Sequence, residues 1–423
     1  MALAACSEDG SGSDAESGSD AAAEEQVQAV PVATDFFEEA PEWSVSVPVG
    51  SQVLQLGDHV VWHNVETGSI GAYDAAGAEA WTEQIEQFAS ETSDVRFRIV
   101  DSQTVAVVQF GTTAAEGLDA GGSVYRVRLY DVASGPVGEP VDVPAESRDL
   151  GLYGLAFPAL DEDGDPTPLE PSYTVSASGE VTEHQPVTDT LAETSVAQTP
   201  TMVVGDVPIL GIAGVPSESS TYGTIEGDFS RGFGGEGWTS MDTAPSSAPD
   251  AGVNAGVLTA ASEQYAVATW ADGDVAFWEE EEARVVGLVD VTSGELVAEL
   301  SCESELDQAY FFEAPDRGVA VLSADGGYLM TGQAVVDTRS GEARCVESER
   351  SVLLHAVDGQ GRAFGGIDGD AEDAETFMLG ADGEVTAAAT GPDVDPPLGF
   401  LEGDLAVHYD RDSGIVTANR LKV

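Results

Sequence analysis

The sequence predicts an all-β protein with the β-propeller architecture, in which eight four-stranded blades form a ring and seven blades is the alternative. Three observations lead to this prediction: a hairpin-like pattern repeats along the chain, the repeats are spaced like blades, and helical periodicity is nearly absent. The clearest copies are GSIGAYDAAGAEAW (68–81), YRVRLYDVASGPVGEPV (125–141), VVGLVDVTSGELVAEL (285–300), QAVVDTRSGEARCV (333–346), ETFMLGADGEVTAAA (375–389) and AVHYDRDSGIVTANRL (406–421).

Each copy is expected to form a β-hairpin. A short apolar run is usually followed by Asp, two or three small polar residues, Gly and a second alternating run. Asp or Ser initiates the turn, and Gly takes the positive-φ position at no steric cost. The marker glycines are Gly77, Gly135, Gly179, Gly294, Gly341, Gly383 and Gly414. Several are separated by about 42 to 47 residues, as expected for four-stranded blades.

The blades are expected to start near residues 51, 95, 150, 196, 252, 308, 352 and 398. The last unit is one strand short, whereas PEWSVSV (41–47) alternates like a strand but has no partner before it. We therefore expect Trp43–Val47 to complete the last blade and close the ring, which removes exposed sheet edges. Residues 185–255 are difficult to divide into strands, which leaves seven blades open.

The pattern resembles the pyrroloquinoline-quinone-like propeller repeat, in which a strand ending near Tyr-Asp leads through a Gly turn to a strand ending in Trp. AYDAAGAEAW (72–81) is the nearest copy, and the resemblance covers about residues 43–423. Quinoprotein dehydrogenases of this kind typically hold their cofactor with Ca²⁺, an Asp base and often two adjacent cysteines. No adjacent cysteines occur here, and no catalytic residue is assigned. A quinoprotein or carbohydrate-active propeller enzyme stays open as an alternative.

The N-terminal region suggests a location. LAAC (3–6) resembles the lipobox of bacterial lipoproteins, in which the cysteine is cleaved at and lipidated. Residues 1–6 are then the remnant of a signal peptide, and the acidic, Ser/Gly-rich residues 7–42 are expected to form a disordered tether. The resemblance implies an extracytoplasmic protein that is held on the outer face of the cell membrane by a lipid on Cys6.

Two further cysteines, Cys302 and Cys345, remain if Cys6 is lipidated. An even pair in an oxidising compartment predicts a disulfide, with two buried free thiols as the alternative.

The charge balance limits the partners. Asp and Glu total 77 against 15 Lys and Arg, which gives a net charge of −62. Such a surface repels phosphate backbones and anionic lipid headgroups, so we expect no nucleic-acid binding and membrane contact only through the anchor. Asp161, Asp163 and Asp165 have the alternating spacing of a Ca²⁺ loop, but Pro166 and Ser172 depart from the EF-hand pattern. We expect no cofactor except, at these three residues, Ca²⁺, and a cation-binding sensory module is a second alternative.

The longest insertion is expected at 217–252, where Arg231, Phe233 and Trp238 are candidates for a ligand-binding loop. Taken together, the sequence favours a monomeric, non-catalytic binding or scaffolding module whose partner is an envelope protein or a cell-wall component.

Overall fold

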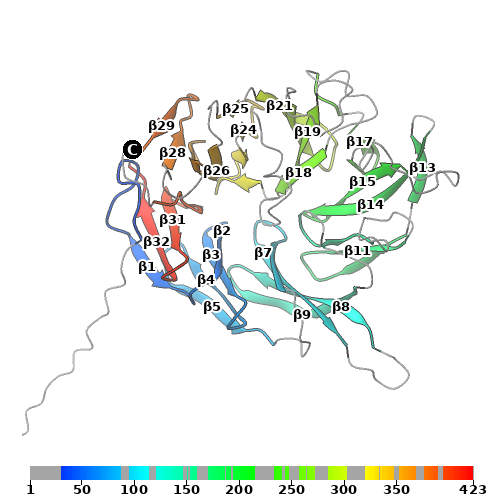
Figure 1. Cartoon of the computed structure of the whole chain (residues 1–423), viewed down its shortest axis with the longest axis horizontal. Coiled ribbons are helices and arrows are strands. Elements are labelled where there is room, and N and C mark those ends of the chain that lie inside the picture. The colour runs from blue at the N-terminus through cyan, green and yellow to red at the C-terminus, as the bar shows by residue number, and fades with distance from the viewer. Residues whose placement is uncertain are drawn as a thin grey trace, which may run out of the picture.

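Eight antiparallel sheets follow one another around a ring in the computed structural model of the chain (Figure 1). The structure describes residues 30–86, 95–113, 121–145, 150, 153–159, 170–185, 187–191, 194–214, 233–240, 243–246, 257–262, 264–271, 284–302, 320–332, 334–346, 352–367, 376–388 and 394–422. All regular structure in these ranges is β-strand, so the predicted eight-bladed propeller is confirmed.

The strands of the first four sheets follow the chain. Blade 1 contains β2 (Gln52–Leu56), β3 (His59–Asn64), β4 (Ser69–Asp74) and β5 (Glu79–Gln84). Blade 2 contains β6 (Val95–Ile99), β7 (Thr104–Thr112), β8 (Ser123–Asp131) and β9 (Gly135–Pro144). Blade 3 contains β10 (Ala156–Phe157), β11 (Ser172–Val175) and β12 (Val181–His184). Blade 4 contains β13 (Val187–Leu191), β14 (Thr194–Val204), β15 (Val207–Gly214), β16 (Phe233–Gly235) and β17 (Trp238–Thr239).

The other four sheets have four strands each. Blade 5 contains β18 (Val257–Ser262), β19 (Tyr265–Ala271), β20 (Arg284–Asp290) and β21 (Leu296–Cys302). Blade 6 contains β22 (Val321–Leu322), β23 (Tyr328–Thr331), β24 (Ala334–Asp337) and β25 (Ala343–Cys345). Blade 7 contains β26 (Val352–Val357), β27 (Ala363–Ile367), β28 (Thr376–Leu379) and β29 (Val385–Ala387). Blade 8 contains β30 (Gly399–Leu401), β31 (Leu405–Asp410), β32 (Ile415–Arg420) and β1 (Trp43–Ser46). Six of the eight blades are thus four-stranded, and blades 3 and 4, with three and five described strands, span the region that was difficult to divide.

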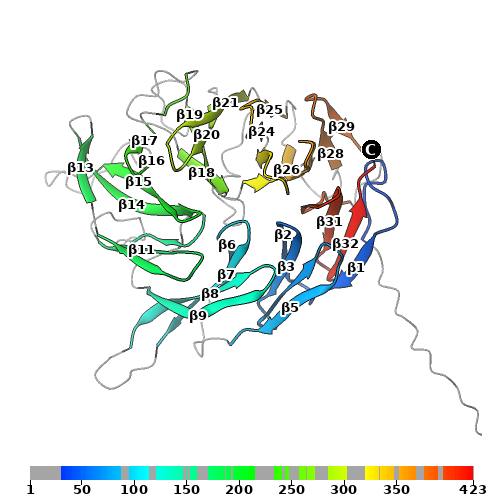
Figure 2. The ribbon, with the colours of Figure 1, turned by 180° about the vertical axis from the view of Figure 1, so that it is seen from behind.

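The ring closes as predicted. Strand β1 is antiparallel to β32, with Trp43 opposite Ala418 and Ser46 opposite Ile415. Figure 2 shows β1 between β32 of its own blade and β5 of blade 1. The first described strand of the chain therefore supplies the outer strand of the last blade.

The apolar core is divided among the seams between blades. One cluster packs Val61 and Ile70 of blade 1 against Phe97 and Val107 of blade 2, and similar clusters occupy other seams. Alternate residues of each strand point to opposite faces of its sheet, so an inner strand can bury apolar side chains in two seams.

Three tryptophans join adjacent blades in the same way. Each indole Nε1 donates a hydrogen bond to a turn carbonyl of the next blade: Trp43 to Ala75 at 2.9 Å, Trp81 to Val132 at 3.0 Å and Trp238 to Val291 at 3.1 Å. Each indole also lies against the positive-φ glycine of that turn, which is Gly77, Gly135 or Gly294. A Cβ on Gly294 would lie only 2.3 Å from Cγ of Trp238, so the glycine is needed for the close approach as well as for its φ of 70°.

Residues 30–42 form an ordered segment, which we call the clasp, at the rim of the ring beside the C-terminus (Figures 1 and 2). The Lys422 amide donates to the carbonyl of Phe36 at 2.7 Å, and the Glu38 amide donates to the carbonyl of Arg420 at 2.9 Å. Phe36 and Phe37 are buried with apolar residues of blades 7 and 8. The prediction of a disordered tether through residue 42 is therefore wrong for residues 30–42, because their valines and phenylalanines are part of the core; residues 7–29 lie outside the described ranges.

Candidate functional site

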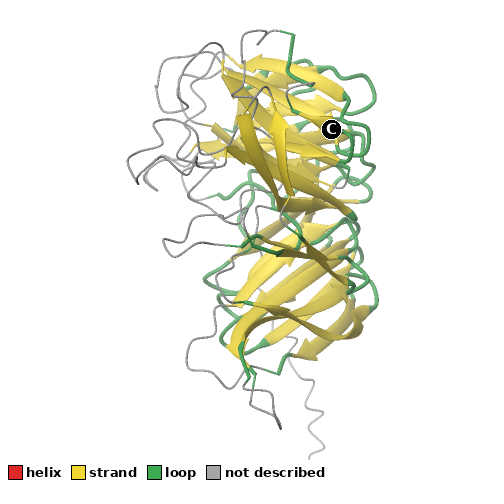
Figure 3. Cartoon of the chain, turned by 90° about the vertical axis from the view of Figure 1, so that its right-hand side faces the viewer, coloured by secondary structure: helices red, strands yellow, loops and turns green. Residues whose placement is uncertain are grey.

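One face of the ring carries the turns that join the first strand to the second and the third to the fourth in each four-stranded blade, and we call it the turn face. Figure 3 views the disc from the side, with strands running between the faces and many of the described turns along the right-hand face. Because antiparallel strands alternate in direction, these two connections must lie at the same end of a blade. The other connections lie at the opposite end.

The turns between third and fourth strands repeat one hydrogen-bonded geometry. The Oδ1 atom of an Asp accepts backbone N–H groups from the turn in four blades, at Asp74, Asp131, Asp290 and Asp337. Asp410 of blade 8 makes the same hydrogen bonds, but its turn joins β31 to β32 and lies on the opposite face. Hydrogen bonds to the carboxylate lower the pKa at Asp131, where Ser134 donates, and at Asp410, where Ser413 donates. The turns are therefore held in one conformation by their own side chains, as the Asp-to-Gly pattern predicted.

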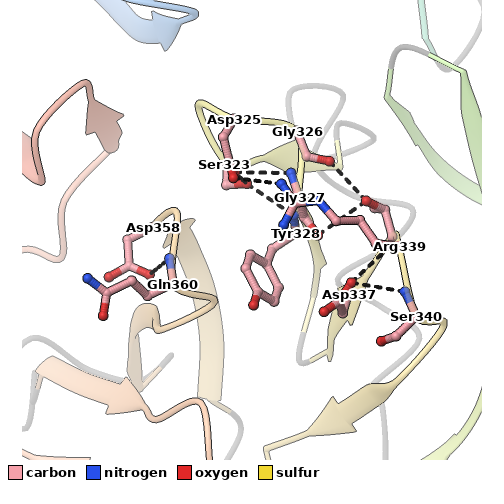
Figure 4. Close-up of polar contacts among 11 residues, drawn as sticks. Ser323, Asp325, Gly326, Gly327, Tyr328, Asp337, Arg339, Ser340, Asp358 and Gln360 are labelled. Atoms are coloured by element: carbon pink, nitrogen blue, oxygen red, sulfur yellow. Dashed lines mark hydrogen bonds and ion pairs between the residues drawn. The ribbon is translucent and has the colours of Figure 1, made fainter.

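Blade 6 carries a polar network on this face (Figure 4). The Asp325 carboxylate accepts hydrogen bonds from Ser323 Oγ at 2.7 Å, from the Gly327 amide at 3.1 Å and from Arg339 Nη2 at 2.7 Å. Burial on its own would raise the pKa of Asp325, but the hydrogen bonds from Ser323 and Arg339 outweigh it and lower that pKa. The network ties the two turns of the blade together and leaves the Arg339 side chain 59% exposed.

A second network links blade 6 to blade 7. Asp358, fully buried, accepts from Arg362 Nε at 2.6 Å and from the Gln360 amide at 2.9 Å. The Tyr328 ring packs against Gly361 of that turn, and Arg344 of β25 donates to the carbonyl of Gly361 and, at 3.3 Å, to that of Ala381. Arg344 thus connects its blade to a turn of the next blade, as the tryptophans do in other seams.

These arginines were not singled out in the sequence, although a usable signal was present. Basic residues total only 15 in 423, and the segment from Arg339 to Arg362 contains four of them. In a chain this acidic, a group of arginines indicates local ion pairing.

The described histidines lie apart from one another. His63, in the seam of blades 1 and 2, and His408, in blade 8, are both buried, and burial lowers the pKa of each to about 4. His184 shares a 2.8 Å hydrogen bond with Thr174 Oγ1 in blade 3. His63, His184 and His408 therefore lie in three separate blades.

Several predicted site residues lie outside the described ranges: Cys6, Asp161, Asp163, Asp165 and Arg231. Within the described ranges, no three His, Cys, Asp or Glu side chains are grouped so that they can hold a metal ion. Ca²⁺ at residues 161–165 stays a prediction.

The prediction that Phe233 and Trp238 belong to a ligand-binding loop is wrong. They lie in β16 and β17 of blade 4 and are 1% and 8% exposed. Their rings form an edge-to-face pair with centroids 5.9 Å apart, and Phe233 also packs against Trp270. The surrounding glycines suggested a loop, but Gly235 is needed because a Cβ there would meet the Trp238 indole.

No protein-family model and no curated protein matches the sequence. Among solved structures, the chain is similar to Porphyromonas gingivalis dipeptidyl peptidase 4 (11% identity, TM-score 0.40, 88% of this chain and 56% of that one). It is also similar to the Dos1 propeller (9% identity, TM-score 0.39, 92% of this chain and 96% of that one). A third similar structure is streptogramin B lyase (10% identity, TM-score 0.37, 93% of this chain and 100% of that one). The chain thus spans about half the length of the peptidase.

In the described part of the chain, no helix has the length and apolar character needed to cross a membrane.

Proposed function

We propose that the protein is a non-catalytic binding module of the cell envelope, with the turn face as its binding surface. The observation that carries the proposal is the repeated Asp turn, whose carboxylate fixes the turn backbone on this face in four blades. A surface that is rigid before binding loses little conformational entropy when a partner docks. The expected partner is an envelope protein or a cell-wall component.

Exposed glutamates give this surface its charge. The residue after the turn glycine is an exposed Glu in four blades, at Glu180, Glu295, Glu342 and Glu384. Complementary charge accelerates association and excludes partners of like charge, so a partner with basic groups is favoured.

We also propose that Cys6 carries a lipid that holds the ring at the outer face of the cell membrane. The proposal is supported by LAAC (3–6). We propose that residues 7–29 form a tether; a flexible tether of that length would have an end-to-end distance of roughly 25 Å, enough to hold the ring clear of lipid headgroups.

Both proposals can be tested in the source cell with the gene at its own locus and its full upstream reading frame. Intact mass is expected to show a diacylglycerol-sized addition on a chain beginning at Cys6, and Cys6→Ala is expected to leave the membrane fraction. An unmodified chain that starts at Met1 contradicts the anchor.

The binding surface is tested by chemical cross-linking in the same cells. Glu295→Lys combined with Glu342→Lys is expected to reduce partner capture at least several-fold. The matched control, Glu66→Lys with Glu86→Lys, places the same charge change at exposed residues of the opposite face. Equal capture by both double variants, or no partner recovered by the wild type, contradicts the binding surface.

We propose that Cys302 and Cys345 form a disulfide. Strand β21, which ends at Cys302, packs against β25, which ends at Cys345. The side chain of Cys302 lies outside the described part of the structure. The bond would join the outer strands of blades 5 and 6.

Removal of this bond by Cys302→Ser is expected to lower the free energy of unfolding by roughly 2–4 kcal/mol, because the loop it closes is long. Denaturant unfolding of the wild type with and without reductant should show the same loss, whereas the Cys302→Ser protein should not respond to reductant. Peptide mapping that finds both thiols alkylated without reduction contradicts the bond.

A further inference from the structure

His408 lies under the clasp with its imidazole removed from water. Its side chain belongs to β31 and is 2% exposed, and its ring meets the Phe37 ring edge-on with centroids 4.9 Å apart. Neither ring nitrogen has a hydrogen-bond partner of normal geometry among the described residues. An imidazole buried in this way is tolerated as the neutral form, whereas an imidazolium without a partner is costly.

The clasp depends on the surface that contains His408. Phe37 is fully buried, and its ring also packs against Phe364 of blade 7, with centroids 5.3 Å apart. Its backbone pairs with Leu421, and the carbonyl of the next residue, Glu38, accepts a 3.0 Å hydrogen bond from Asn419 Nδ2. The clasp therefore covers a seam with aromatic rings on one side and His408 on the other.

Few charged groups near His408 are placed so that they could stabilise a protonated imidazole. The clasp carries Asp35, Glu38, Glu39 and Glu42, all exposed, while β31 ends at Asp410 and β32 at the exposed Arg420. Strands β27 and β28 of blade 7 contain no ionisable residue. Asp395 lies in the segment before β30, and its backbone raises the pKa of His408, which partly offsets the lowering caused by burial. Desolvation and the charge of Asp410 raise the pKa of Asp395, so the Asp395 carboxylate is neutralised at a higher pH than an ordinary aspartate.

We propose that His408 is a pH-sensitive latch for the clasp: protonation of its imidazole releases residues 30–42 from blades 7 and 8 while the other blades stay folded. The released segment is the one that connects the ring to the chain leading to Cys6. Acidification would then lengthen the connection between the ring and the N-terminal region.

The sign and size follow from linkage. Burial lowers the pKa of His408 to about 4 with the clasp closed, against 6.5 for an exposed histidine. The open form therefore binds a proton first as the pH falls below 6.5, and opening is favoured progressively down to pH 4. Between pH 7.5 and pH 5 the ratio of open to closed clasp is expected to rise about 30-fold.

Hydrogen exchange followed by mass spectrometry tests the latch in the full chain. The readout is the protection factor of peptides that cover 30–42 and 415–422, compared with peptides of β19 and β20 in blade 5. In the wild type, clasp protection is expected to fall about 30-fold from pH 7.5 to pH 5 while blade 5 stays protected. In His408→Gln this pH dependence should be lost.

The matched control is His63→Gln. His63 is 1% exposed, its pKa is also lowered to about 4, and its ring packs against Phe97 rather than against the clasp. This variant should keep the wild-type response of the clasp. If His408→Gln does not fold, the wild-type profile decides, together with His408→Asn: clasp protection that is constant to pH 5, or lost together with that of blade 5, overturns the proposal.

Discussion

Replacement of Phe37 by alanine is expected to lower the free energy of unfolding by about 3–5 kcal/mol, the usual cost of truncating a fully buried phenylalanine. Phe37 is 0% exposed and contacts Phe36, Phe364 and His408. The cavity would open at the place where the clasp joins blades 7 and 8, so little neighbouring chain is available to refill it. Equilibrium unfolding in guanidinium chloride, followed by circular dichroism, measures the change.

Phe37→Leu is the matched control, since it keeps most of the apolar volume, and its loss should be near 1 kcal/mol. If Phe37→Ala unfolds at the wild-type denaturant concentration, the clasp does not contribute to the core. That result would also remove the structural basis of the proposed latch.

Replacement of Gly77 by alanine is expected to destabilise the closed ring by about 2–5 kcal/mol through two additive effects. The first is backbone strain, because Gly77 has a φ of 76°, where a side chain costs about 1–2 kcal/mol. The second is a steric clash: a Cβ on Gly77 would lie 2.7 Å from Cγ of Trp43 and force the indole away from the Ala75 carbonyl. Trp43 belongs to the closing strand, so this clash weakens the contact between blades 8 and 1.

Gly50→Ala separates the two effects. Gly50 has the same φ of 76°, but a Cβ there would meet nothing within 4 Å. Its loss should therefore be limited to the backbone strain, about 1–2 kcal/mol. In a Trp43→Ala background, Gly77→Ala should cost no more than Gly50→Ala, and a larger cost there would show that the indole is not the cause.

The repeated turn was predictable because its determinants are local. An Asp, two or three small residues and a Gly specify a turn whose hydrogen bonds lie within five residues, as at Asp290 and Gly294. The closing strand was predictable by counting, since the last blade lacked one strand and residues 41–47 had no neighbour. Both inferences need only short-range chemistry and the requirement that a sheet edge be paired.

The misplaced residues share a different cause. Phe36 and Phe37 follow a long acidic segment, and Phe233 and Trp238 are surrounded by glycines, so composition suggested a tether and a loop. Their burial depends on partners that are far away in the sequence: Phe364 and Leu421 for the clasp, Val291 and Gly294 for Trp238. Average composition over a window does not contain that information.

By itself, then, the amino-acid sequence determined the all-β class, the eight-unit repeat, the turn chemistry and the strand that closes the ring, because each depends on neighbouring residues or on the count of units. Only the tertiary structure decided what fills the seams: which tryptophan meets which glycine, that Arg344 joins blades 6 and 7, and that the clasp covers His408. The physical reason is that a seam is formed by two sheets from distant parts of the chain, and burial, close approach and desolvation exist only after those sheets have packed together.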